Sequence, residues 1–171
     1  MTLLLTNEDA RDIFTMNECI AALEGAYRDI SRGIATPGGR SVMISETGQE
    51  DGVYSLKMLG GVVPALGVGA IRINSDILTW PESGGAKRRV KLPKAPGGRW
   101  VGLVLLFDIT TAEPLAIFPD GVVQRMRVAG TSALGVKYMA REDASTAALI
   151  GSGWQAGSQV PALCAVREIK L

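Results

Sequence analysis

A glycine-rich turn near the C-terminal end of this 171-residue sequence has the spacing of a nucleotide-binding element. Residues 146–150 before it are typical of a short buried strand, and an apolar helical run follows to about Val166. In a dinucleotide-binding fold, the first glycine permits the sharp turn, the second admits a pyrophosphate to backbone N–H groups, and the helix N-terminus faces the phosphates. The same turn is also common without any ligand. Its residues are Gly151, Ser152, Gly153, Trp154, Gln155 and Ala156.

Histidine is absent from the sequence. Its absence excludes a Ser-His-Asp triad, a Cys-His pair and most zinc sites within these residues, and we expect no metal site. Cys19 and Cys164 lie far apart in apolar, helix-like surroundings, which predicts two buried free thiols. Any acid–base chemistry must therefore use carboxylates, lysine, tyrosine or a cofactor.

The composition predicts a folded, soluble protein, with 47% hydrophobic and 20% charged residues. The net charge of +1 gives no long-range reason for binding nucleic acid or an acidic membrane. No stretch approaches the roughly 20 apolar residues that span a bilayer, and the N-terminus lacks the basic start of a signal peptide. We therefore expect a cytoplasmic protein with neither nucleic acid nor membrane as a partner.

The first elements are predicted to be a short strand and two helices. Thr6 with Asp9 three residues later forms a capping pattern, and Asn17 is the expected N-cap of the second helix. Strands are then expected at 53–58 and 65–73.

A loop rich in glycine, proline and basic residues is expected at 82–99. A hairpin follows, from the apolar runs at 100–107 and 115–118. The helix predicted from 121 to about 140 carries Arg125 and Arg127, and its phase does not decide which of them points inward.

These elements predict an α/β protein in two parts. Residues 1–143 form an α+β domain, and residues 144–171 form the strand, glycine turn and helix that begin a dinucleotide-binding (Rossmann) domain. Pro161 lies inside that helix, where it removes one backbone hydrogen bond and costs about 3 kcal/mol, so a kink is expected there. Another strand is expected to start at 168–171.

Six stretches of the sequence, taken in order, resemble the ornithine cyclodeaminase/mu-crystallin family. Together they cover essentially the whole chain. The resemblance implies that residues 1–143 are the substrate-binding and dimerisation domain, and that residues 144–171 are the truncated start of the NAD(P)-binding Rossmann domain. The stretches are YSLKMLGGVVPALG, RINSD, APGGRWVGLVLLFD, EPLAIFPDG, RMRVAGTSALG and LIGSGWQAGSQ.

The resemblance implies hydride transfer at the α-carbon of an amino acid, through an imine, with NAD or NADP as the cofactor. Such an enzyme converts ornithine to proline and ammonia, dehydrogenates an amino acid, or reduces a cyclic ketimine. The implied partners are a small amino acid or cyclic imine and a second copy of the chain. The sequence leaves the substrate, and the choice between NAD and NADP, open.

By the same resemblance, Arg40 and Arg127 match arginines that bind the substrate carboxylate, and Lys57 matches the catalytic, substrate-binding lysine. The six turn residues match the cofactor-binding turn. From the residues alone, Arg40 is equally consistent with an exposed loop charge and Lys57 with a solvent-facing strand position. Val128 departs from the family pattern, because many members have threonine there.

The family's catalytic aspartate and the remaining Rossmann strands have no counterpart in these residues. We therefore expect an ornithine cyclodeaminase-like oxidoreductase that does not turn over substrate as this chain alone, with cofactor binding in doubt. The alternatives are a non-catalytic remnant that dimerises or binds a small ligand, and a product without function.

Overall fold

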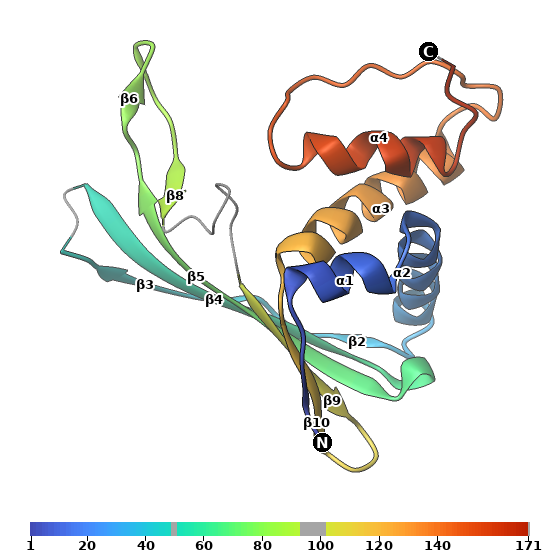
Figure 1. Cartoon of the computed structure of the whole chain (residues 1–171), viewed down its shortest axis with the longest axis horizontal. Helices are drawn as coiled ribbons and strands as arrows, with labels where there is room; N and C mark the ends of the chain where they lie inside the picture. The colour runs from blue at the N-terminus through green and yellow to red at the C-terminus, as the bar shows by residue number, and fades with distance from the viewer. Residues whose placement is uncertain (49–50, 93–101, 171) are drawn as a thin grey trace. The chain divides into compact units, whose positions relative to one another are not determined.

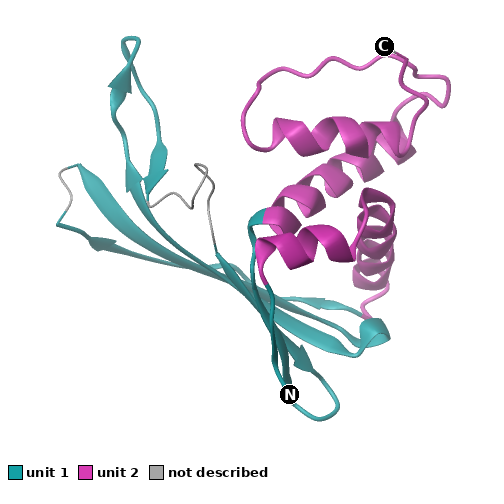
Figure 2. Ribbon diagram, in the orientation of Figure 1, with its two compact units in different colours: residues 1–5, 35–121 teal, residues 6–34, 122–171 magenta. Residues whose placement is uncertain are grey.

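Strands and helices of this chain fall into two compact units. The computed structural model describes residues 1–48, 51–92 and 102–170. One unit, here called the sheet unit, comprises Met1–Leu5 and Ala35–Gly121, and the other, the helical unit, comprises Thr6–Ile34 and Val122–Leu171 (Figure 2). The predicted α/β class is confirmed, because the chain forms both a large sheet and four α-helices. The predicted domain boundary between residues 143 and 144 stays a prediction.

The sheet unit contains an eight-stranded, almost entirely antiparallel sheet (Figure 1). The strand order is β1-β10-β9-β5-β4-β2, with β3 also paired to β4 and β8 to β5. Among the described strands, only β1 and β10 run parallel. The strands are β1 (Leu3–Leu4), β2 (Thr36–Pro37), β3 (Ser41–Glu46), β4 (Gly52–Val63), β5 (Val68–Thr79), β8 (Val90–Leu92), β9 (Leu103–Asp108) and β10 (Pro114–Pro119).

The long hairpin of β4 and β5 is the centre of this sheet. Each strand has 12 residues, and their pairing runs from Gly52 opposite Thr79 to Val63 opposite Val68. The 3₁₀ turn η1 (Pro64–Leu66) joins them and ends at Gly67, whose φ of +66° favours glycine. The strand expected at 65–73 therefore starts three residues late, because proline opens the turn.

The loop expected at 82–99 is partly wrong. Strands β6 (Glu82–Ser83) and β7 (Ala86–Lys87) form a separate two-stranded hairpin. Its loop residues, Gly84 and Gly85, have φ of +61° and +74°, as a tight two-residue hairpin loop requires. Strand β8 then pairs with β5, and the rest of the predicted loop lies outside the described residues. The hairpin of β9 and β10 is confirmed.

The helical unit packs three helices around a core of small side chains. Its buried cluster consists of Ile20 from α2, Ala129, Ala133 and Leu134 from α3, and Ala162 from α4. Small residues let helix backbones approach closely, so the nine-residue helix α4 is stabilised by packing against α2 and α3. The helices are α1 (Asn7–Ile13), α2 (Met16–Ser31), α3 (Gly121–Met139) and α4 (Ala156–Cys164).

Side chains cap the first two helices. Thr6 and Asp9 form the predicted capping box of α1. The N-cap of α2 is Thr15, with Glu18 as its reciprocal partner, so the expected cap at Asn17 is wrong. Glu18 lies three residues after the threonine and can bond back to its N–H, which gives Thr15 the advantage. This backbone hydrogen bond also lowers the pKa of the Glu18 carboxyl.

Contacts from distant residues close both ends of α3. At the start, the Val122 N–H donates to the Asn7 side chain, 3.2 Å away. At the end, the Arg167 guanidinium donates to four carbonyl oxygens at 3.0–3.1 Å. The last carbonyls of a helix lack donors from a following turn, and the arginine supplies N–H donors to this end of the helix. The four carbonyls belong to Val136, Lys137, Ala140 and Arg141.

The two strands expected in the C-terminal segment are not formed. Residues 146–150 have no regular secondary structure, and Ile150 is fully exposed. A strand needs a partner for its ladder of hydrogen bonds, and no described residue pairs with this segment. Residues 168–170 are also irregular, although the Lys170 N–H donates to the Ser145 carbonyl at 2.9 Å.

Helix α4 continues through Pro161, with a hydrogen bond from the Ala165 N–H to the Pro161 carbonyl. Cys19 is buried as predicted, and burial raises the pKa of its thiol. The prediction for Cys164 is wrong, because this thiol lies exposed at the end of α4. Within the described ranges no helix is both long and apolar enough to cross a membrane.

Two glycines of α3 should respond differently to the same substitution. A Cβ at Gly130 would lie 2.8 Å from Leu23 Cδ1 and 3.4 Å from Cys19 Sγ, whereas one at Gly135 would meet no atom within 4 Å. We expect Gly130→Val to destabilise the protein by about 1–3 kcal/mol through overpacking. Gly135→Val should change the unfolding free energy by less than about 0.5 kcal/mol. Urea unfolding of both variants measures this difference, and equal effects would contradict the packing.

A charged cluster between α2 and α3 should make stability depend on pH. Glu24 accepts hydrogen bonds from Lys137, at 2.7 Å, and from Tyr138, and these lower the pKa of its carboxyl below the ordinary 4.5. A lowered pKa stabilises the folded state above pH 4.5, and this contribution is lost as the pH falls through the lowered pKa.

Glu24→Gln should therefore lower the melting temperature at pH 7, and its difference from the wild type should shrink as the pH falls below 4.5. Melting curves from pH 3 to pH 8 measure the effect. Glu142→Gln, at an exposed position outside the helices, is the control and should follow the wild type throughout. A Glu24→Gln difference that stays constant down to pH 3 would contradict the linkage.

Candidate functional site

Polar residues share one face of the β4–β5 hairpin. Arg72, Asn74 and Asp76 alternate along β5, so their side chains lie on the same face. Lys57 stands opposite Asn74, and Ser55 stands opposite Asp76. Directly opposed residues of an antiparallel pair point to the same side of a sheet, and all five residues therefore belong to one polar face.

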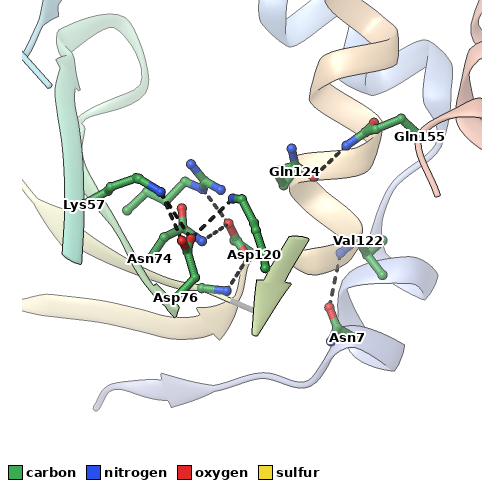
Figure 3. A network of polar contacts seen from close by, with 11 residues as sticks. Asn7, Lys57, Asn74, Asp76, Asp120, Val122, Gln124 and Gln155 are labelled. Atoms are coloured by element: carbon green, nitrogen blue, oxygen red, sulfur yellow. Dashed lines mark hydrogen bonds and ion pairs between the residues drawn. The ribbon is translucent and has the colours of Figure 1, made fainter. Parts of the chain in front are cut away.

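Lys57, the predicted catalytic lysine, is held in an ion pair on this face. Its Nζ lies 3.1 and 3.3 Å from the two carboxylate oxygens of Asp76 (Figure 3). The Lys91 Nζ, from β8, lies 3.3 Å from Asp76 Oδ2. Only 7% of the Asp76 side chain and 16% of the Lys57 side chain are exposed. Lys57 thus has a fixed, half-buried ammonium group, and its catalytic role stays a prediction.

A second buried carboxylate, Asp120, accepts hydrogen bonds from the neighbouring residues of this face. Its Oδ2 accepts hydrogen bonds from Arg72 Nε at 2.5 Å and Asn74 Nδ2 at 3.4 Å (Figure 3). Its Oδ1 accepts one from the Gly102 N–H at 2.5 Å. A Cβ at Gly102 would overlap the Asn74 amide and the Ile73 carbonyl, so this position directly before β9 requires glycine.

Sequence reasoning missed both buried carboxylates. The signal was present in the segment Arg-Ile-Asn-Ser-Asp, where polar residues alternate in an otherwise apolar strand. That alternation shows which residues share a face, but not that the face is buried.

Arg40, predicted to bind the substrate carboxylate, is exposed directly before β3. The first residue of β3, Ser41, pairs with Met58, the chain neighbour of Lys57. Within the described ranges, no contact joins Arg40 to Lys57. The structure thus places Arg40 at the start of a strand that borders β4, and its role stays a prediction.

The predicted glycine turn is formed in the helical unit. Gly151 has a φ of +104°, a conformation that favours glycine, and α4 begins at Ala156. A Cβ at Gly151 or Gly153 would meet no atom within 4 Å, so the backbone of the turn is open. Gln155 is the N-cap residue without a side-chain cap bond, and its Nε2 donates to Gln124 Oε1 at 2.8 Å (Figure 3).

Of the two arginines on α3, Arg125 is the one that contacts the turn. Its guanidinium lies 4.3 Å from the centroid of the Trp154 ring, a cation–π distance. It also lies against the backbone of Gly157, where any Cβ would overlap Nη2. Arg127 is exposed on the helix, and its predicted role at the substrate carboxylate stays a prediction. Ser152 is exposed in the turn.

Loss of the Asp120 carboxylate should destabilise the sheet. Asp120→Ala leaves the Arg72 guanidinium and the Gly102 N–H without their acceptor, and we expect a loss of about 3 kcal/mol in unfolding free energy. Asp143→Ala is the control, since its ion pair with Arg141 is 3.5 Å long and its side chain is 79% exposed. That variant should lose less than about 0.5 kcal/mol. Chemical denaturation of both variants measures their unfolding free energies. Similar losses in the two variants would contradict a structural role for the buried Asp120 carboxylate.

The chain is similar to known proteins. The model of the ornithine cyclodeaminase/mu-crystallin family matches residues 93–171. A Δ¹-pyrroline-2-carboxylate reductase from Bacillus thuringiensis is 27% identical over 98% of this chain and 47% of its own length. An ornithine cyclodeaminase from Agrobacterium fabrum is 39% identical over 70 residues, which are 39% of this chain and 20% of that protein.

Among solved structures, the Δ¹-pyrroline-2-carboxylate reductase of Thermococcus litoralis, in complex with NADH and L-proline, superimposes with a TM-score of 0.76. It is 28% identical, and the match covers 99% of this chain and 47% of that one. The chain thus spans about half the length of the relatives that it matches along its whole length. Residues 93–171 thus match the ornithine cyclodeaminase/mu-crystallin family model, and the whole chain is similar to about half of a Δ¹-pyrroline-2-carboxylate reductase.

Proposed function

We propose that this chain provides the substrate-binding sheet and the pyrophosphate-binding turn of an NAD(P)-dependent oxidoreductase that acts at the α-carbon of an amino acid or cyclic imine. The observation that carries the proposal is the half-buried ammonium group of Lys57, fixed by Asp76 on a polar sheet face. A related reductase holds NADH and L-proline, a ligand with a carboxylate that such a cation binds.

Three cations are proposed to bind the substrate. Lys57 binds the carboxylate and exchanges a proton at the substrate nitrogen, since a lysine can serve as both cation and acid. Arg40 and Arg127 are proposed as further carboxylate ligands, which suits the bidentate geometry of a guanidinium group. Fixing the carboxylate orients the α-carbon for hydride transfer.

The residues of the glycine turn fit a dinucleotide pyrophosphate. The open backbone at Gly151 and Gly153 admits phosphate oxygens, and the first turn of α4 offers the positive end of the helix dipole. Ser152, Trp154, Gln155 and Ala156 complete the turn. The cofactor, when bound, donates or accepts the hydride.

The proposal extends to a cytoplasmic homodimer. Strand β3 supports the dimer, because within the described residues it pairs with β4 alone and leaves apolar side chains on both faces exposed. Val42 and Met43 are each 45% exposed, and Ile44 is 65% exposed. Light scattering of the purified chain measures the oligomeric state.

Calorimetric titration of the chain with L-proline tests the substrate part of the proposal. The wild type should bind L-proline, and Lys57→Gln should weaken binding about tenfold because the carboxylate loses a partly desolvated cation. L-prolinamide, which lacks the carboxylate, should not bind. Lys87→Gln, at an exposed position in the hairpin of β6 and β7, is the control and should bind as the wild type does.

A titration with NADH tests the cofactor part separately. Binding that Gly151→Val removes would support the glycine turn as the pyrophosphate site, since valine disfavours the φ of +104°. Failure of the wild type to bind NADH would contradict the proposed cofactor site in this chain. The proposed substrate site would then still be tested by the L-proline titration.

A further inference from the structure

Asp76 is shared by two lysines from different strands. Its carboxylate lies 3.1 Å from Lys57 Nζ, on β4, and 3.3 Å from Lys91 Nζ, on β8. Both strands pair with β5, which carries Asp76, so the three side chains converge from three adjacent strands. One carboxylate balances only one ammonium group, and the trio therefore carries one positive charge in excess.

The neighbouring groups do not remove this excess. Arg72 is paired with Asp120, at 2.5 Å, and that pair is neutral by itself. Ser55, directly opposite Asp76, is fully buried, and its hydroxyl has no hydrogen-bond partner among the described residues. The excess positive charge attracts an anion to the two ammonium groups.

We infer that the Lys57–Asp76–Lys91 trio is a site for one carboxylate group, in which Asp76 is a positioning residue and Lys91 is the second cation. This inference rests on the proposed function and extends it to two residues that the family resemblance did not supply. Each ammonium group has three N–H donors, and the bonds to Asp76 leave donors of both lysines for one ligand.

The charge balance selects the ligand class. A single carboxylate neutralises the trio, whereas a dianion such as inorganic phosphate leaves a negative excess near the buried Asp76. Side-chain exposures of 16% for Lys57 and 33% for Lys91 leave both ammonium groups within reach of a ligand. The substrate class is therefore an amino or imino acid with one carboxylate at this site.

Lysine labelling with an amine-reactive reagent, read by mass spectrometry, tests the positioning role without any ligand. In Asp76→Asn, the labelling rates of Lys57 and Lys91 should rise several-fold, because their common acceptor is weakened. Lys87 should be labelled at the wild-type rate, and Asp76→Glu should restore part of the protection. Circular dichroism verifies that each variant is folded. Unchanged rates at Lys57 and Lys91 in folded Asp76→Asn would overturn the inference.

Titration with L-proline tests the carboxylate site. Lys91→Gln should weaken L-proline binding about tenfold, and Lys87→Gln should not change it. Asp76→Asn adds one net positive charge, so a purely electrostatic role predicts tighter binding, whereas positioning predicts weaker binding. Tighter binding in Asp76→Asn, or wild-type affinity in Lys91→Gln, would overturn the inference.

Two further outcomes separate this inference from the proposed function. Inorganic phosphate that binds the wild type as tightly as L-proline does would overturn the assignment to one carboxylate. If L-proline does not bind the wild type at all, the proposed substrate site and the carboxylate role of Lys91 are both wrong. The labelling result then still decides whether Asp76 positions Lys57.

Discussion

The sheet unit depends on one buried carboxylate, Asp120, at the end of the strand hairpin that leads into α3. A buried charge is tolerated only when hydrogen-bonded, and here β5 supplies the Arg72 and Asn74 side chains while Gly102, directly before β9, supplies a backbone N–H. The pairing of β5 with β4 and β9 fixes which side chains of β5 share this face. Asp76, two residues beyond Asn74, lies on the same face, where it holds Lys57. The buried carboxylate at Asp120 and the ion pair of the candidate catalytic lysine thus belong to one polar face.

Much of the architecture could be predicted because its signals are local. The capping box at Thr6, the β9–β10 hairpin and the extent of α3 all arise from residues close together in sequence. The ion pairs could not be predicted from pattern, because their partners lie 19 residues apart for Lys57 and Asp76, and 48 for Arg72 and Asp120. The strand expected at 146–150 failed for a related reason, since an apolar run becomes a strand only beside a partner strand.

Two other differences involve signals that are local in the sequence. Gly84-Gly85 is a strong signal for a two-residue hairpin loop. It lies in a segment whose many glycine, proline and basic residues are typical of an irregular loop. For the arginines of α3, the core residues Ala129 and Ala133 mark the inward face at intervals of four. Arg125 is four residues before Ala129 and shares that face, whereas Arg127 does not. The helix phase was thus decided by small residues, which a search for large apolar side chains overlooks.

The cap that Arg167 places on α3 has a consequence for synthesis of the chain on the ribosome. The carbonyls at the end of α3 belong to residues 136–141, and their donor is 26 residues beyond the last of them, after α4. The final turn of α3 therefore emerges well before its cap is made. Until Arg167 follows, these carbonyls lack its N–H donors, so the end of α3 and the segment after α4 reach their final structure together.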